Sequence, residues 1–254
     1  MNAARIAALA RSGIAVEVVQ ETGSTNADLL ARAPQLTVPL LLAAEHQTAG
    51  RGRAGRSWLS APGHSLTFSL AWRFAGGLRA LPGLPLAVGV ALAETLGRLG
   101  QPVQLKWPND VLKDGDKLAG ILVETQAMPD GAAWTIVGIG VNLVMPDALE
   151  EKIGRSAAAM PWLARMDRDE LMASLLDGLA DALALFARAG FGAFAPRWNL
   201  LHAWQGRPVV LLDRGEVLHE GLAAGVDDTG RLLLDTAAGR VTVVAGDVSL
   251  RARD

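Results

Sequence analysis

A seven-residue segment with three arginines and three glycines is the part of this sequence that most directly indicates chemistry. It covers residues 50–56 and reads Gly-Arg-Gly-Arg-Ala-Gly-Arg. Guanidinium groups bind phosphate or carboxylate oxygens in pairs, and glycine lets the backbone approach a ligand closely. Such a loop can close over a polyanionic ligand such as ATP. A solvated basic loop and a nucleic-acid contact are the alternatives, and the segment lacks the ending of a P-loop.

A second segment, residues 106–110 (Lys-Trp-Pro-Asn-Asp), is followed at a short spacing by Lys117. Capping of a turn by Asn109 and Asp110 is the alternative explanation. Taken with Lys117, however, the segment offers a stacking surface, polar contacts and a cation. Because Lys117 precedes an apolar strand, we expect its ammonium at the mouth of that strand. Gly120 leaves room there for a ligand that lies flat against the sheet.

Two weaker patterns have structural explanations of equal weight. Residues 23–26 (Gly-Ser-Thr-Asn) place hydroxyls and an amide at the expected start of a helix. There they suit helix capping as well as hydrogen bonds to a neutral polar head group. Residues 138–142 (Gly-Ile-Gly-Val-Asn) form an expected strand with two glycines, which indicates close packing as readily as a binding site.

The elements that position these segments follow from the periodicity of the apolar residues. The helices are expected at 2–12, from Ser24 or Thr25 onward, and at 86–99, 168–189 and 191–204. The strands are expected at 14–20, 40–45, 66–72, 103–106 and 134–144, with a hairpin formed by 111–112 and 117–124. After about residue 206 the pattern changes to five short strands at 208–212, 217–222, 232–235, 241–244 and 248–250. These elements predict an α+β domain over residues 1–204 and a small β-barrel over 205–254.

Composition limits what these segments can do. The chain has 254 residues, of which 50% are hydrophobic and 20% charged, so it can form a packed core. A net charge of -2 argues against a general nucleic-acid binder. Without cysteine there are no disulfides or thiol nucleophiles, and the four histidines have no metal-ligand spacing. No apolar run reaches the roughly 20 residues of a membrane helix, so we expect a soluble cytoplasmic protein without membrane contact.

In their order and spacing, these segments together resemble the biotin protein ligase family. The match covers nearly all of the chain from about residue 16 to residue 250, and it is specific because the arginine loop and the Lys-Trp-Pro-Asn-Asp segment occur together. The matching residues are 24–26, 45–56 with Trp58, 106–110, 117–122 and 138–142. The resemblance implies a mixed β-sheet flanked by helices, as in class II aminoacyl-tRNA synthetases, followed by an SH3-like β-barrel.

The resemblance also implies an activity. Such ligases activate biotin with MgATP to biotinyl-5′-adenylate and transfer biotin to a lysine of the biotin carboxyl carrier protein of acetyl-CoA carboxylase. The biotin carboxylate must approach the α-phosphate of ATP, so the reaction needs cations that offset the repulsion between two anions, and it needs no protein nucleophile. The resemblance implies Lys117 and Arg51 as the catalytic residues. The implied biotin site is Ser24, Thr25, Asn26, Gln47, Gly50, Arg51, Gly52, Arg53, Trp58, Lys117, Gly120 and Leu122. The implied ATP site is Arg51, Arg53, Arg56, Trp58, Trp107, Asn109, Asp110, Lys117 and Asn142.

Several questions stay open at this point. Magnesium is expected to bind through the ATP phosphates, and Asp110 either bridges to Mg²⁺ through water or pairs with an arginine. Many family members have arginine where Ala54 stands, which removes one cation. No room exists before Ile14 for a winged-helix domain, so we expect a ligase-only type that binds no DNA. The alternatives are a lipoate or octanoate ligase of the same superfamily, a non-catalytic biotin-dependent regulator and an SH3-like adaptor, and homodimerisation stays open.

Overall fold

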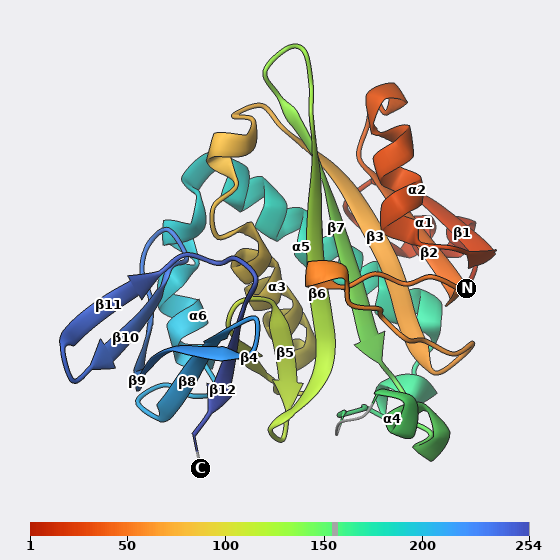
Figure 1. Cartoon of the computed structure of the whole chain (residues 1–254). Helices are drawn as coiled ribbons and strands as arrows, with labels where there is room; N and C mark the ends of the chain where they lie inside the picture. The colour runs from red at the N-terminus through yellow and green to blue at the C-terminus, as the bar shows by residue number, and fades with distance from the viewer. Residues whose placement is uncertain (154–156, 254) are drawn as a thin grey trace.

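The computed structural model describes residues 1–153 and 157–253, and Figure 1 shows two β-sheets with helices packed against them. The larger sheet has seven strands in the order β1-β2-β3-β7-β6-β5-β4. Only its β1-β2 pair is parallel among these neighbours, so this sheet is mixed. The smaller sheet is antiparallel, with the order β11-β10-β9-β8-β12. The predicted fold class is therefore confirmed.

The strands of the larger sheet are β1 (Ala15–Thr22), β2 (Leu40–Gln47), β3 (Ser65–Phe74), β4 (Gln104–Lys106), β5 (Asp110–Lys113), β6 (Asp116–Ala127) and β7 (Ala133–Asn142). The α-helices are α1 (Ala3–Leu9), α2 (Thr25–Arg32), α3 (Leu84–Arg98), α4 (Asp147–Ile153), α5 (Arg168–Ala189) and α6 (Ala195–Leu201). The smaller sheet consists of β8 (Pro208–Asp213), β9 (Glu216–Val226), β10 (Leu232–Thr236), β11 (Gly239–Val243) and β12 (Val248–Ala252).

Every predicted helix and strand has a counterpart, but two details differ. The helix expected over 191–204 is shorter, because Pro196 lies in the first turn of α6 and a separate 3₁₀ turn precedes it. Helix α4 was not predicted. Its sequence, Asp-Ala-Leu-Glu-Glu-Lys-Ile, is short and has no extended apolar period to indicate a helix.

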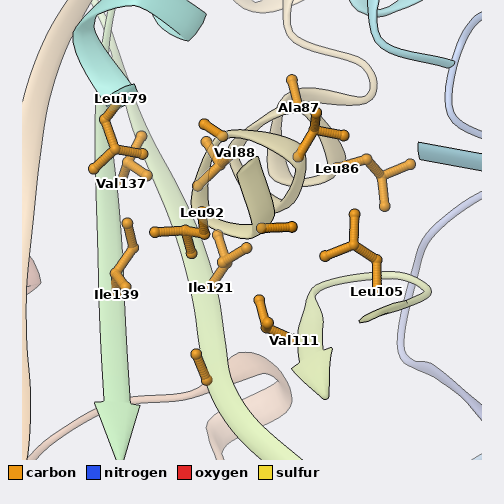
Figure 2. Packing of buried hydrophobic residues seen from close by; sticks show 14 of the residues in the cluster. Leu86, Ala87, Val88, Leu92, Leu105, Val111, Ile121, Val137, Ile139 and Leu179 are labelled. Atoms are coloured by element: carbon orange, nitrogen blue, oxygen red, sulfur yellow. The ribbon is translucent and has the colours of Figure 1, made fainter. Parts of the chain in front are cut away.

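The two faces of the larger sheet are covered differently. On one face, α3 and α5 form the main apolar core with the sheet, and Figure 2 shows Leu92 of α3 beside Ile121, Val137 and Ile139. The other face carries the short α2, which packs Leu29 into a second, smaller cluster that contains Leu42, Trp134 and Ile136. Because α2 has only eight residues, it leaves the neighbouring part of that face to loops and polar side chains.

The main apolar core continues from the larger sheet into the smaller one. Trp198 of α6 belongs to the same cluster as Val209 and Leu211 of β8. Trp107 also donates its indole N–H to the Gly230 carbonyl at 3.2 Å. The division into 1–204 and 205–254 falls between α6 and β8, and it stays a prediction. Among the described residues, no helix has the length and apolarity that a membrane crossing requires.

Candidate active site

The predicted site residues meet around one cavity next to β6 and β7. Its wall is formed by the start of α2, the arginine loop, residues 106–110, the two strands and part of β12. In Figure 1 the arginine loop, drawn in orange, crosses β6. The predicted residues that line the cavity are Ser24, Thr25, Asn26, Gln47, Arg51, Gly52, Arg53, Arg56, Trp58, Trp107, Asn109, Asp110, Lys117, Gly120 and Leu122.

Gly50 and Asn142 lie just outside this wall. A Cβ on Gly50 would meet the Trp58 carbonyl oxygen at 2.4 Å, so the loop needs glycine for close backbone packing. Asn142 lines a neighbouring cavity together with Arg56, Trp58 and Lys117. Its amide donates to the Ala158 carbonyl at 3.1 Å and to the Lys117 carbonyl at 3.4 Å. Asn142 thus supports the backbone of Lys117, and its role in ATP binding stays a prediction.

One end of the cavity is a buried network of neutral hydrogen-bonding groups. Ser24 is the N-cap of α2 and accepts from the backbone N–H of Ala27 at 3.4 Å. The Thr25 backbone N–H donates to Oε1 of Gln47 at 2.8 Å, and the hydroxyls of Thr25 and Ser69 are 2.7 Å apart. Capping and ligand binding, posed as alternatives for this segment, are therefore compatible. This end suits a neutral polar head group.

Glycines on the sheet let two side chains lie flat against it. Gly138 faces Asn26, because an added Cβ would come within 2.2 Å of its Oδ1. Gly140 faces the Trp58 ring, where an added Cβ would also meet an atom at 2.2 Å. The space above Gly120 was predicted for a ligand, but Trp58 and the Lys117 ammonium both come within 3.1 Å of a Cβ built there. The glycines therefore shape the cavity wall through these side chains.

The opposite end of the cavity is charged. Nζ of Lys117 lies 2.5 Å from Oδ1 of Asp110, and Nζ of Lys106 lies 3.6 Å from Oδ2. Asp110 therefore pairs with two lysines, and its charge also raises the pKa of the Arg53 guanidinium against the effect of burial. The register of β5 and β6 shifts between Val111 and Leu112, and this irregularity lies next to Lys117, the second residue of β6. The ammonium of Lys117 lies at the strand mouth, as expected.

The arginines of the loop are held by groups from three different segments. Nη2 of Arg51 lies 2.9 Å from Oε1 of Glu124 on β6. Arg53 donates to Oδ1 of Asn109 at 3.0 Å and also to the Gly246 carbonyl of the smaller sheet's last connection. Burial lowers the pKa of the Arg53 guanidinium, and the positive charge of Arg56 lowers it further. The loop is thus closed against both sheets.

The predicted site residues did not include several residues that line or support the cavity, among them Ser69, Glu124 and Lys106. Ser69 is fully buried in β3 and bonds Asn26 and Thr25. Glu124 bonds Asn26 and Arg51 from β6. Lys106 lines the cavity beside Asp110. For Glu124 a signal existed, because an acidic residue within an apolar strand requires a partner. Ser69 had no signal beyond strand alternation.

Comparison with known proteins agrees with this geometry. Residues 16–142 match the Biotin/lipoate A/B protein ligase family, and residues 206–251 match the Biotin protein ligase C terminal domain. The chain is 34% identical to the biotin--[acetyl-CoA-carboxylase] ligase of Paracoccus denitrificans, over 91% of the chain and 98% of the relative. It is 36% identical to the bifunctional ligase/repressor BirA of Escherichia coli (strain K12), over 95% of the chain and 76% of the relative.

A solved structure with a similar fold is the biotin protein ligase from Aquifex aeolicus in complex with biotin and ATP. It has a TM-score of 0.77 and 30% sequence identity, over 94% of this chain and 99% of that one. Fold and cavity together define a member of the biotin and lipoate ligase superfamily. More narrowly, the chain belongs to the biotin protein ligase family, and it is an enzyme, as expected.

Proposed function

We propose that this cavity is where the chain activates biotin with MgATP and from which biotin is transferred to a protein lysine. The observation that carries the proposal is the convergence of Lys117, Arg51 and Arg53 on a cavity whose other end is neutral and polar. A ligand with a neutral polar ring and a carboxylate tail matches this cavity, because the ring suits the neutral end and the carboxylate suits the charged end. ATP supplies the second anion. Lipoate and octanoate lack a head group that would use the polar end.

The neutral end is proposed to bind the ureido ring of biotin. Ser24, Thr25 and Gln47 offer hydroxyl and amide groups there, and Trp58 supplies an apolar wall. The ureido group contains both N–H donors and a carbonyl acceptor, so a site of hydroxyls and amides can satisfy it without any charge. Gly50, Gly52 and Leu122 are proposed to shape this end through backbone packing and apolar contact.

The charged end is proposed to join the two substrates. A carboxylate oxygen of biotin attacks the α-phosphorus of ATP, the bond to the β-phosphate oxygen breaks, and pyrophosphate leaves. Lys117 and Arg51 offset the repulsion between the two anions and the charge that develops on the phosphorus oxygens. Arg53, Arg56, Trp107 and Asn109 are proposed to hold the nucleotide. The amine of the acceptor lysine then attacks the carbonyl carbon of the mixed anhydride, and AMP leaves.

Magnesium is proposed to enter with the ATP phosphates, whose charge it neutralises. The residues present fit this arrangement better than a resident ion site. Asp110 is already flanked by two lysine ammonium groups. Within residues 1–153 and 157–253, no cluster of three or more His, Cys, Asp or Glu side chains is arranged to hold a metal ion. Asp110 is therefore assigned to orienting Lys117.

The acceptor is proposed to be the biotin carboxyl carrier protein of acetyl-CoA carboxylase, in the cytoplasm where that enzyme and ATP occur. Support comes from the names of two relatives, in Paracoccus denitrificans and Mycobacterium tuberculosis (strain ATCC 25618 / H37Rv), which are biotin--[acetyl-CoA-carboxylase] ligases. Residues 205–254 are proposed as a separate barrel domain. Homodimerisation is a further proposal, with β1 at one end of the larger sheet as the pairing strand.

The test is pyrophosphate release from MgATP with biotin, lipoate or octanoate supplied separately to the purified chain. We expect release with biotin, followed by labelling of one lysine on a carrier domain. Release with lipoate or octanoate instead would assign the cavity to the sister enzymes. Tight biotin binding without release would favour a non-catalytic regulator.

A further inference from the structure

Glu124 connects the two ends of the cavity, and neither the sequence patterns nor the proposed mechanism assigns it a role. It lies on β6, and its side chain is 19% exposed. One carboxylate oxygen, Oε1, is 2.9 Å from Nη2 of Arg51. The other, Oε2, accepts a hydrogen bond from Nδ2 of Asn26 at 2.9 Å. A carboxylate paired with a guanidinium is an acceptor only, so the orientation of the Asn26 amide is fixed.

Both polar atoms of the Asn26 side-chain amide have partners within the protein. Its nitrogen donates to Glu124 and, at 3.4 Å, to the Leu122 carbonyl. Its oxygen accepts from the Ser69 hydroxyl at 2.6 Å. The side chain is buried, with 4% of the residue exposed. Through the bond to Ser69, Asn26 also influences the hydroxyl groups of the cavity wall.

The fixed orientation of the Asn26 amide determines where the hydroxyl protons of Ser69 and Thr25 lie. A hydroxyl has one proton, and that of Ser69 points to Asn26. Across the 2.7 Å contact between Thr25 and Ser69, the Thr25 hydroxyl must then be the donor. The same hydroxyl also lies 3.1 Å from Oε1 of Gln47, which can accept from it as well as from the Thr25 backbone N–H at 2.8 Å. Both neighbours of the Thr25 hydroxyl are then acceptors, so its proton stays within the protein and an oxygen lone pair is left for the cavity.

We propose that Glu124 is a positioning residue that fixes the direction of the hydrogen-bond chain Asn26–Ser69–Thr25, so that Thr25 presents an acceptor lone pair to a ligand N–H. The chain starts at an acceptor that cannot reverse and ends at a residue of the cavity wall. The inference rests on the proposed function, because the N–H it selects is one of the ureido ring. It adds a reason why a head group with N–H donors is preferred.

The test is a double-mutant cycle on biotin affinity, measured by calorimetry without ATP. Glutamine at 124 can turn either an oxygen or an amide nitrogen toward Asn26, so the chain can reverse. We expect Glu124→Gln and Ser69→Ala each to weaken biotin binding about tenfold. In the Ser69→Ala background the chain is already cut, so adding Glu124→Gln should have no further effect. Glu17→Gln is the matched control, because Glu17 on β1 also has its carboxylate paired with an arginine, Arg32 of α2. This variant should leave the affinity for biotin unchanged.

A second measurement keeps the proposal testable if Ser69→Ala does not fold. Desthiobiotin keeps the cyclic urea, so Glu124→Gln should weaken its binding by the same factor, while the weak binding of lipoate, which has no N–H, stays constant. Equal biotin affinity of Glu124→Gln and the parent chain would overturn the proposal. Additive losses in the cycle would also overturn it, because they would assign the effect to Arg51. Failure of the parent chain to bind biotin would instead refute the proposed function.

Discussion

The two ends of the cavity differ in the length, charge and burial of their side chains. The neutral end consists of short side chains from α2 and the sheet, among which Thr25 is 2% exposed and Ser69 is fully buried. The charged end consists of long cations on loops and strand ends, with the Arg51 side chain 49% exposed. Every short side chain already has a fixed partner, whereas the cations pair with groups that an incoming anion can replace. Selectivity thus comes from the rigid end and reactivity from the adjustable end.

The largest effect is expected from removing the central cation. Lys117→Ala should lower the rate of adenylate formation about 1000-fold, because Lys117 is the cation proposed to lie where the biotin carboxylate meets the α-phosphate. Pyrophosphate release measures this effect. The unfolding temperature should stay close to that of the parent chain, since the Lys117 side chain is one of the partly exposed members of the cavity wall.

Lys113→Ala is the matched control for this prediction. Lys113 lies at the end of β5 and donates to the Pro102 carbonyl at 3.3 Å, away from the main cavity. The Lys113→Ala variant should release pyrophosphate at the rate of the parent chain. A folded Lys117→Ala protein with near-normal pyrophosphate release would remove Lys117 from the assigned role.

A second prediction concerns the apolar support between the two sheets. His202 is buried against Trp198, with ring centroids 4.7 Å apart, and burial lowers its pKa to about 4. The unfolded chain binds a proton near pH 6.5, so between pH 6.5 and 4 it holds more protons than the folded protein. Stability is therefore complete above pH 6.5 and falls by about 3 kcal/mol as the pH drops to 4.

Urea unfolding at pH 7 and pH 4.5 measures this loss. In a His202→Phe variant the part of the pH dependence that His202 contributes should vanish, although its stability at pH 7 changes as well. His219→Phe, at a less buried position on β9, is the control and should keep the slope. An unchanged slope in His202→Phe would contradict the assignment of the loss to His202.

A third prediction tests the glycines under the cavity wall. In Gly140→Ala the added methyl would meet the Trp58 ring at 2.2 Å, so the ring must move. We expect the KM for biotin to rise about 30-fold through loss of the apolar wall. Gly97→Ala is the control, because no atom lies within 4 Å of its added Cβ, and in α3 it should be neutral or slightly stabilising. Equal biotin KM in both variants would show that Trp58 is not part of the biotin site.

The smallest effect is expected from the arginine that connects the loop to both sheets. Arg53→Gly should speed release of the adenylate about tenfold, because the contacts to Asn109 and Gly246 that close the loop are lost. Biotin affinity should change less than twofold, since the neutral end keeps its network. Single-turnover assays that follow bound and free adenylate measure both values. Unchanged adenylate release would argue against closure by this loop.

The sequence predicted the fold class because its apolar periods are long and its breakers are clear, as in α5, whose bounds were predicted correctly. The charged end was also predictable, since clustered arginines and a lysine at a strand mouth are evident in the chain itself. The partners of these cations were not predictable. Glu124 and Asp110 meet Arg51 and Lys117 only through strand register, and the shift between Val111 and Leu112 has no sequence signal.

The glycines under Trp58 and Asn26 have a consequence for inhibitor design. A compound that packs on these two side chains binds a wall whose shape is set from beneath by Gly138 and Gly140. Any larger residue at either glycine would push into Asn26 or Trp58. Substitutions there that weaken such an inhibitor would disturb the enzyme's own ligand site as well. This part of the cavity therefore offers few routes to resistance that keep the activity intact.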